Sequence, residues 1–171
     1  MRFCFIGHTY HLKTKSTRFL LDVMYSLGSV DEFSSSPDED IFSDDALVSS
    51  LACSNYDCYV FLQTEYIAEK LINLDLGRFV IVPMYDGAIG RPRNYWKMFV
   101  DVQFISFSRA HHEILREVDC NSVYFRYFPH VAAEEFDRDV AHRSAFFWER
   151  RPDLRLNLPF VLQLSKSIGI Q

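Results

Sequence analysis

The chain has 171 residues with a formal net charge of −5, and 49% of its residues are hydrophobic and 16% aromatic. This composition is typical of a folded globular protein with one sizeable core, and it excludes a largely disordered chain. No long basic run is present, so the sequence gives no reason to expect nucleic acid as a partner. No window approaches the roughly 20 apolar residues of a membrane span, and we expect a cytoplasmic protein.

The four cysteines include no C-x-x-C pair, and Cys4 and Cys58 lie inside apolar runs. We therefore expect small, reduced core residues without a catalytic role. The histidines are poor candidates for metal binding, because no cysteine or carboxylate stands at a suitable spacing from His8 and His11. The sequence predicts no metal site and no cofactor.

In chain order, apolar runs of strand length alternate with stretches that have helical spacing. Several runs are continuous, as is typical of parallel strands that helices cover on both faces. The runs span residues 3–6, 29–33, 58–62, 79–84, 104–107 and 123–128, the second being weaker than the others. Helices are predicted at residues 17–27, 44–52, 66–74 and 109–118, and an apolar helix-like tail at 158–168.

This alternation favours an α/β fold: a Rossmann-like, doubly wound and mainly parallel sheet of six strands with helices on both faces. A C-terminal extension of one strand and one helix follows. The acidic stretch at residues 34–40 is interpreted as a solvated loop without chemistry. Known cofactor motifs are absent, since neither a G-x-G-x-x-G nor a Walker A sequence follows the first run. A receiver domain is also disfavoured, because Gln63 and Arg109 follow strands at positions where it needs an aspartate and a lysine.

The loop at residues 8–17 follows the first apolar run and is rich in histidine, lysine and hydroxyl side chains. In open α/β sheets, ligands bind at the carboxyl ends of the strands. If the strand order is 3-2-1-4-5-6, the first and fourth strands are neighbours, and the loops after them face each other across one crevice. This order places His8, Tyr10, His11, Lys13 and Lys15 opposite Tyr85, Asp86, Arg91 and Arg93.

The strand ends at residues 57–62, 79–86, 104–109 and 124–129 resemble the N-terminal half of bacterial GT-B glycosyltransferases of polysaccharide synthesis. Such enzymes are two Rossmann-like domains that face a cleft. The resemblance implies an acceptor-side domain at residues 1–130. Residues 131–171 are then a linker with either the start of a truncated donor-side domain or a docked tail. In that second domain, the resemblance implies a phosphate-binding role for Arg150 and Arg151.

The resemblance implies an enzyme that transfers a sugar from a nucleotide-sugar donor to a glycan or lipid-linked acceptor, with this portion inactive alone. Such a transfer needs a base for the acceptor hydroxyl, and His8 and Asp86 are the candidates. The candidate substrate contacts are Tyr10, His11, Lys13, Lys15, Tyr85, Arg91 and Arg93.

Each of these residues also has a structural alternative. His8 could simply pack the loop, Asp86 before Gly87 could form an Asx turn, and exposed basic residues are often only solvated. We expect the large apolar ring of Trp96 to pack in the core, although it could also stack on a sugar. Peripheral membrane association and a homodimer through the C-terminal tail stay open. The alternative function is a non-enzymatic, flavodoxin-like module that binds a small ligand or a protein.

Overall fold

The computed structural model describes residues 1–36, 41–88, 90–125 and 158–168. The chain divides into two compact units, Met1–Phe128 and Pro129–Gln171. The described part of the second unit is helix α8 (Leu158–Ile168), which confirms the helix predicted there. The strand predicted in the tail, together with Arg150 and Arg151, lies outside the described residues. Within the described ranges, no helix combines the length and hydropathy that a bilayer crossing requires.

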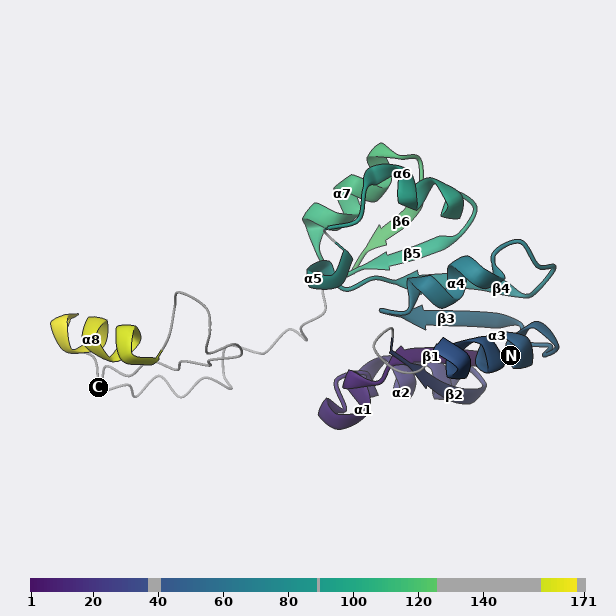
Figure 1. Cartoon of the computed structure of the whole chain (residues 1–171), viewed down its shortest axis with the longest axis horizontal. Coiled ribbons are helices and arrows are strands. Elements are labelled where there is room, and N and C mark those ends of the chain that lie inside the picture. The colour runs from purple at the N-terminus through teal and green to yellow at the C-terminus, as the bar shows by residue number, and fades with distance from the viewer. Residues whose placement is uncertain (37–40, 89, 126–157, 169–171) are drawn as a thin grey trace. The chain divides into compact units, whose positions relative to one another are not determined.

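Six parallel strands form one sheet in the order β2-β1-β3-β4-β5-β6 (Figure 1). Each strand overlaps a predicted apolar run, including the weak second one. The overlap is smallest for β6, which shares two residues with the run at 123–128, and residues 126–128 lie outside the described parts of the chain. The α/β fold with a six-stranded parallel sheet is therefore confirmed. The strands are β1 (Arg2–His8), β2 (Ser29–Ser35), β3 (Cys58–Leu62), β4 (Arg78–Val82), β5 (Gln103–Ser106) and β6 (Asn121–Tyr124).

The strand order assumed from the sequence, 3-2-1-4-5-6, is wrong. Strand β1 pairs with β2 on one side and with β3 on the other, and β4 lies one strand further away. Without its outermost strand, the assumed order becomes 2-1-3-4-5, and the observed order is this one with a sixth strand added beyond β5. The winding of the sheet therefore reverses between β1 and β3.

The four longer helices of the first unit confirm the predicted ones. They are α2 (Arg18–Leu27), α3 (Ile41–Ala52), α4 (Glu65–Leu71) and α7 (Arg109–Glu117). The sequence did not predict the short helices α1 (Tyr10–Thr14), α5 (Tyr85–Ala88) and α6 (Arg93–Trp96) or the 3₁₀ turn η1 (Lys97–Phe99). With one turn or little more, these elements are too short for an apolar period to show. The segment at residues 8–17, expected to be a loop, thus contains a helix.

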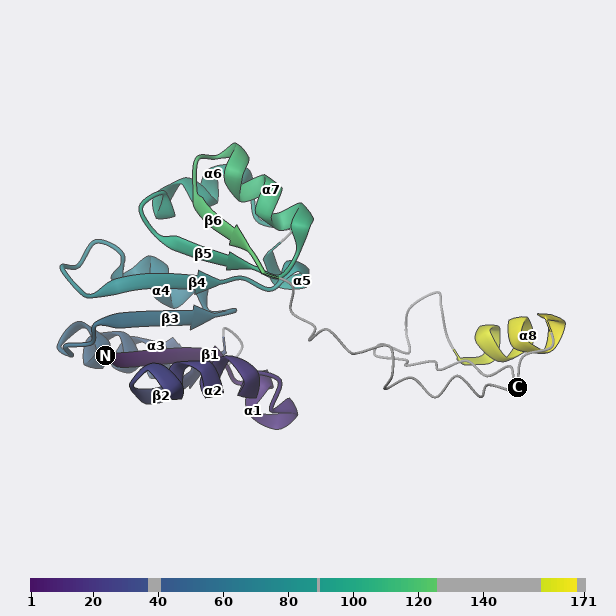
Figure 2. The ribbon, with the colours of Figure 1, turned by 180° about the vertical axis from the view of Figure 1, so that it is seen from behind.

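Helices cover both faces of the sheet (Figure 2). On one face, Leu21 and Met24 of α2 pack against Phe5 and its neighbours on β1 and β3. On the other face, α3, α4, α6 and α7 enclose a larger aromatic core around Phe61 and Trp96. Trp96 is 1% exposed, which confirms its placement in the core. Every residue of β3 is buried, and this double burial explains why its sequence is continuously apolar.

Candidate functional site

The carboxyl ends of β1 and β3 meet at the reversal point of the sheet, where doubly wound folds bind ligands. Helices α1 and α5 lie at the edge toward which the strands point (Figure 1). The two strand ends are tied together by the buried hydroxyl of Thr64, whose Oγ1 donates a hydrogen bond to the carbonyl oxygen of Ile6 at 2.9 Å. The segments that follow β1 and β3 are therefore held close together.

Helix α1 is a single tight turn that directs His11 inward. His8 ends β1, and its Nδ1 accepts a hydrogen bond from the backbone N–H of Tyr10 at 3.1 Å, so the side chain caps the turn. The turn ends at Lys15, which has a left-handed φ of 50° and donates its N–H to the carbonyl oxygen of His11. His11 is only 8% exposed, whereas Tyr10 is 46% exposed.

Both ring nitrogens of His11 have hydrogen-bond partners. Nε2 lies 3.0 Å from Oε1 of Gln63, and Nδ1 lies 2.7 Å from Oγ of Ser16. Because an amide oxygen only accepts, Nε2 carries the proton, and in the neutral ring Nδ1 accepts from the Ser16 hydroxyl. Thr14 Oγ1 lies 2.9 Å from Ser16 Oγ and extends this chain of hydrogen bonds.

Gln63 is the residue that connects the strand ends. It follows β3 with a φ of 58°, a left-handed conformation that is uncommon outside glycine. Its backbone N–H donates to the carbonyl oxygen of Val82 at the end of β4. A Cβ atom added at Gly87 in α5 would lie 3.3 Å from Gln63 Nε2, so the turn after β4 packs closely on this side chain. Gln63 thus stands between His11 and the β4 loop.

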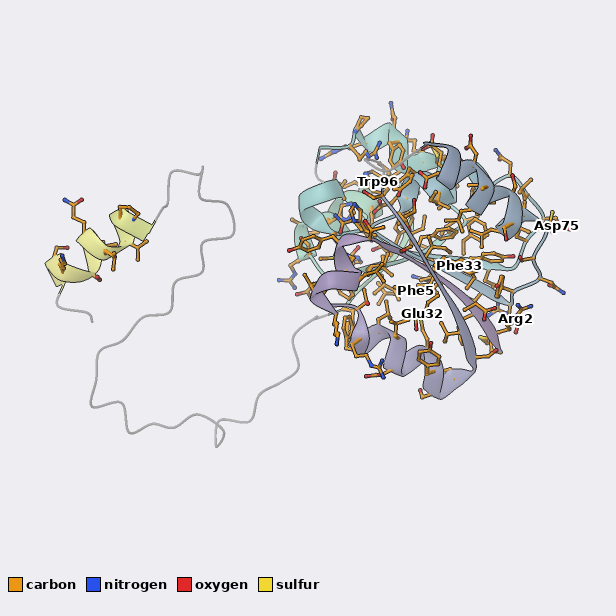
Figure 3. All side chains as sticks on the ribbon, turned by 60° about the horizontal axis from the view of Figure 1, so that its bottom comes forward. Arg2, Phe5, Glu32, Phe33, Asp75 and Trp96 are labelled. Carbon is orange, nitrogen blue, oxygen red and sulfur yellow. The ribbon has the colours of Figure 1, made fainter. Side chains whose placement is uncertain are left out.

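A cavity of about 80 Å³ opens between the ends of β1 and β2 and the first helices. Phe5, Glu32 and Phe33, three of its lining residues, are labelled in Figure 3. His8 and His11 also line it, with their ring centroids 6.4 Å apart. Within the described ranges, no three His, Cys, Asp or Glu side chains gather closely enough to hold a metal ion.

A second polar group lies beyond β3. Glu65 in the first turn of α4 is 8% exposed, and burial raises the pKa of its carboxyl group, an effect that the positive charge of Arg91 partly offsets. The Arg91 guanidinium lies over the ring of Tyr95, 4.7 Å from the ring centroid. Burial raises the pKa of the Tyr95 hydroxyl to about 12. Glu65 follows Gln63 and Thr64 in sequence, so this group adjoins the residue that contacts His11.

The structure brings some of the predicted site residues together and separates others. His8, Tyr10 and His11 form one cluster, with the Tyr10 and His11 ring centroids 6.0 Å apart. The predicted crevice between the loops after the first and fourth strands is wrong, because β3 and Gln63 lie between them. Arg93 forms an ion pair with Glu117 of α7 at 2.8 Å. The side chains of Lys13, Tyr85 and Asp86, and all of Arg150 and Arg151, lie outside the described parts of the structure.

Sequence reasoning used Gln63 only as an argument against a receiver domain and did not place it in the site. The available signal was position, because Gln63 follows the buried strand β3 just as His8 ends β1. The interpretation of residues 34–40 as a solvated loop is wrong for its first residues. Ser35 ends β2, is buried, and forms hydrogen bonds with the buried Asp44 carboxylate and, at 2.7 Å, with the Tyr66 hydroxyl. Residues 37–40 lie outside the description.

No protein-family model matches the chain, and no curated protein sequence matches it.

Proposed function

We propose that the sheet domain is the acceptor-side domain of a GT-B glycosyltransferase, which binds the hydroxyl-bearing acceptor at the carboxyl ends of β1 and β3. The observation that carries this proposal is the pair His8 and His11 at the reversal point of the sheet, with His11 held by Gln63. The two side chains that bind the His11 ring, Ser16 and Gln63, are neutral hydrogen-bonding groups. The half-exposed ring of Tyr10 supplies a flat apolar face for a sugar.

In the proposed reaction, the two histidines have different tasks. Both nitrogens of His11 already have partners, which suits a binding role. His8 is only half-buried, and because its Nδ1 accepts a backbone N–H, the neutral ring carries its proton on Nε2. As the base, His8 would take the acceptor proton on Nδ1 in exchange for that backbone hydrogen bond. Asp86 remains a second candidate base. Lys13, Lys15, Arg91, Arg93, Arg150 and Arg151 remain candidate contacts for the diphosphate or for a charged acceptor.

We expect neutral glycosides to bind at this edge of the sheet. Titration of the 171-residue chain with methyl glycosides of glucose, galactose and N-acetylglucosamine should shift the backbone amide NMR signals of Gly7, His8, His11 and Gln63. Tyr10→Ala should weaken binding about fivefold, because a stacked aromatic ring contributes on the order of 1 kcal/mol. Tyr124 is 42% exposed at the sheet edge, so Tyr124→Ala is a matched control. Glycosides that shift none of these amides would contradict the proposal.

The second candidate function is a non-enzymatic binding module. It is favoured by the complete hydrogen bonding of the His11 ring, since Ser16 and Gln63 already occupy both of its nitrogens. The two functions differ in what the apolar C-terminal residues do. For the glycosyltransferase we expect self-association through residues 146–168, whereas for the binding module we expect sedimentation as a monomer. Analytical ultracentrifugation over a range of concentrations distinguishes the two.

The proposed enzyme takes a nucleotide-sugar donor and a glycan or lipid-linked acceptor. Peripheral membrane association would follow from a lipid-linked acceptor. Flotation of the chain with liposomes, with and without a polyprenyl phosphate sugar, tests that part of the proposal.

A further inference from the structure

We propose that Ser16, His11 and Gln63 form a nucleophilic serine centre that accepts a short acyl group from an ester. This activity goes beyond the glycosyltransferase function and does not depend on it. Ser16 Oγ lies 2.7 Å from His11 Nδ1, and His11 Nε2 lies 3.0 Å from Gln63 Oε1. A hydroxyl, a base and a group that orients the base are thus aligned within hydrogen-bond distance, the arrangement that activates a serine.

The chemistry of the three side chains sets the direction of the proton transfer. The Gln63 carbonyl oxygen can only accept, so it holds the proton of His11 on Nε2. The lone pair of Nδ1 is then directed at the Ser16 hydroxyl, which is the proton donor of that pair. His11 is 8% exposed, so bulk water competes little for its ring. Ser16 is more accessible, because its side chain is only partly buried.

The neighbouring cavity suits a small acyl group. It measures about 80 Å³ and is lined by His11, Leu12 and Thr17, the last of which follows Ser16 directly. A space of this size has room for a few water molecules or an acetyl group, but not for a long acyl chain. Thr14 Oγ1, at 2.9 Å from Ser16 Oγ, holds the serine side chain in its position beside the ring.

The proposed step is an ordinary acyl transfer. Ser16 Oγ attacks the ester carbonyl carbon while its proton moves to His11 Nδ1, and a tetrahedral intermediate forms. The C–O bond to the leaving alcohol then breaks, and the alcohol takes the proton from Nδ1, which leaves acyl-Ser16. Attack by water through the same proton transfers releases the carboxylic acid and regenerates the serine. The sum is ester plus water giving acid plus alcohol.

Gln63 makes a sharp test possible. A neutral amide orients the imidazole but stabilises the imidazolium less than a carboxylate does, so the native centre should be slow. Gln63→Glu supplies that carboxylate and should accelerate acylation at least about tenfold. A gain of this kind cannot result from a loss of folding.

The experiment uses p-nitrophenyl acetate with the full 171-residue chain. We expect a burst of p-nitrophenolate close to one equivalent per chain and an acetyl group on Ser16 in the peptide map. Ser16→Ala and His11→Gln should abolish the burst. Ser26→Ala is the matched control, because Ser26 is an exposed serine of the adjacent helix α2, and it should react like the native chain.

Two results would overturn the proposal. One is an acetylation rate in Ser16→Ala equal to that of the native chain, with the acetyl groups on lysines. The other is a Gln63→Glu variant that folds, as judged by far-UV circular dichroism, and shows no acceleration.

Discussion

His111 is a buried histidine on α7 with an unusual environment. It is 1% exposed, its ring packs edge-on against Trp96, and neither ring nitrogen has a hydrogen-bond partner among the described residues. Burial lowers its pKa from the ordinary 6.5 to about 4. Between these two pH values the unfolded chain binds a proton that the native state does not, so stability decreases as the pH falls through this window. Below both values the loss amounts to about 3 kcal/mol.

We expect His111→Phe to remove most of this acid sensitivity, because phenylalanine has a similar shape and no titratable ring. Urea unfolding followed by circular dichroism at pH 7, 5 and 4 measures the free energy of unfolding of each variant. His112→Gln is the control, because His112 is half-buried with its Nδ1 2.9 Å from the Ser122 hydroxyl. An equally steep loss of stability in His111→Phe would show that His111 is not the group responsible.

At the scale of elements, Gly77 fixes the entry into β4. A Cβ atom at this position would lie 2.1 Å from the carbonyl oxygen of Tyr56, in the turn that leads into the neighbouring β3. That distance is much shorter than a van der Waals contact between a carbon and a backbone oxygen. The two turns can therefore approach each other only because residue 77 has no side chain. The pairing of β3 with β4 starts directly after this contact, with Cys58 opposite Arg78.

Gly77→Ala should therefore destabilise the domain by about 2 kcal/mol or more, since the backbone of two paired strands must shift. Gly90→Ala is the matched control, because a Cβ at Gly90 meets nothing within 4 Å, and its effect should stay within about 0.5 kcal/mol. Thermal unfolding of the two variants and the native chain measures the difference. Equal melting temperatures for the two variants would contradict the close approach at Gly77.

Much of the element structure could be predicted from the sequence, because its signals are local. The continuous apolar run of β3 and the helical spacing of apolar residues in α2 can each be recognised from the residues of that one element. The one-turn helix α1 could not be predicted, because it depends on hydrogen bonds that reach other elements, such as Thr9 N–H to the carbonyl oxygen of Ser35 at 3.0 Å.

The site was only partly predictable, because the order of the strands depends on how several elements pair and cannot be recognised from the sequence of any one of them. The two histidines were found from their place after the first strand. Gln63 was missed because its importance depends on β3, rather than the fourth strand, being the neighbour of β1. Its contacts to His11 and to the β4 turn follow from that order.

At the scale of the whole molecule, the four cysteines report on the integrity of the sheet domain. Cys53 is exposed, whereas Cys4, Cys58 and Cys120 are buried, and all four are free thiols. Burial raises the pKa values of the three buried thiols, that of Cys4 to about 12, so they are protonated and poorly reactive at neutral pH.

We expect one thiol per chain to react rapidly with Ellman's reagent in the native protein and four in denaturant. Cys53→Ser should abolish the rapid phase and leave the slow one. The slow phase should follow the opening of the domain, because the reagent reaches the other thiols only after the strands separate. Two or more rapidly reacting thiols in the native chain would show that Cys4, Cys58 or Cys120 is accessible to the reagent without opening of the domain.

The position of β1 between β2 and β3 also has a consequence for biosynthesis. During translation, β1 emerges before both partners, and its pairing with β3 must wait until residues 9–57 have followed. Until then one edge of an apolar strand stays open on the nascent chain, where a chaperone or another polypeptide can bind it. The same pairing completes the ligand edge, since Gln63 reaches His11 only once β3 is in place. The site therefore cannot assemble before β3 has emerged from the ribosome.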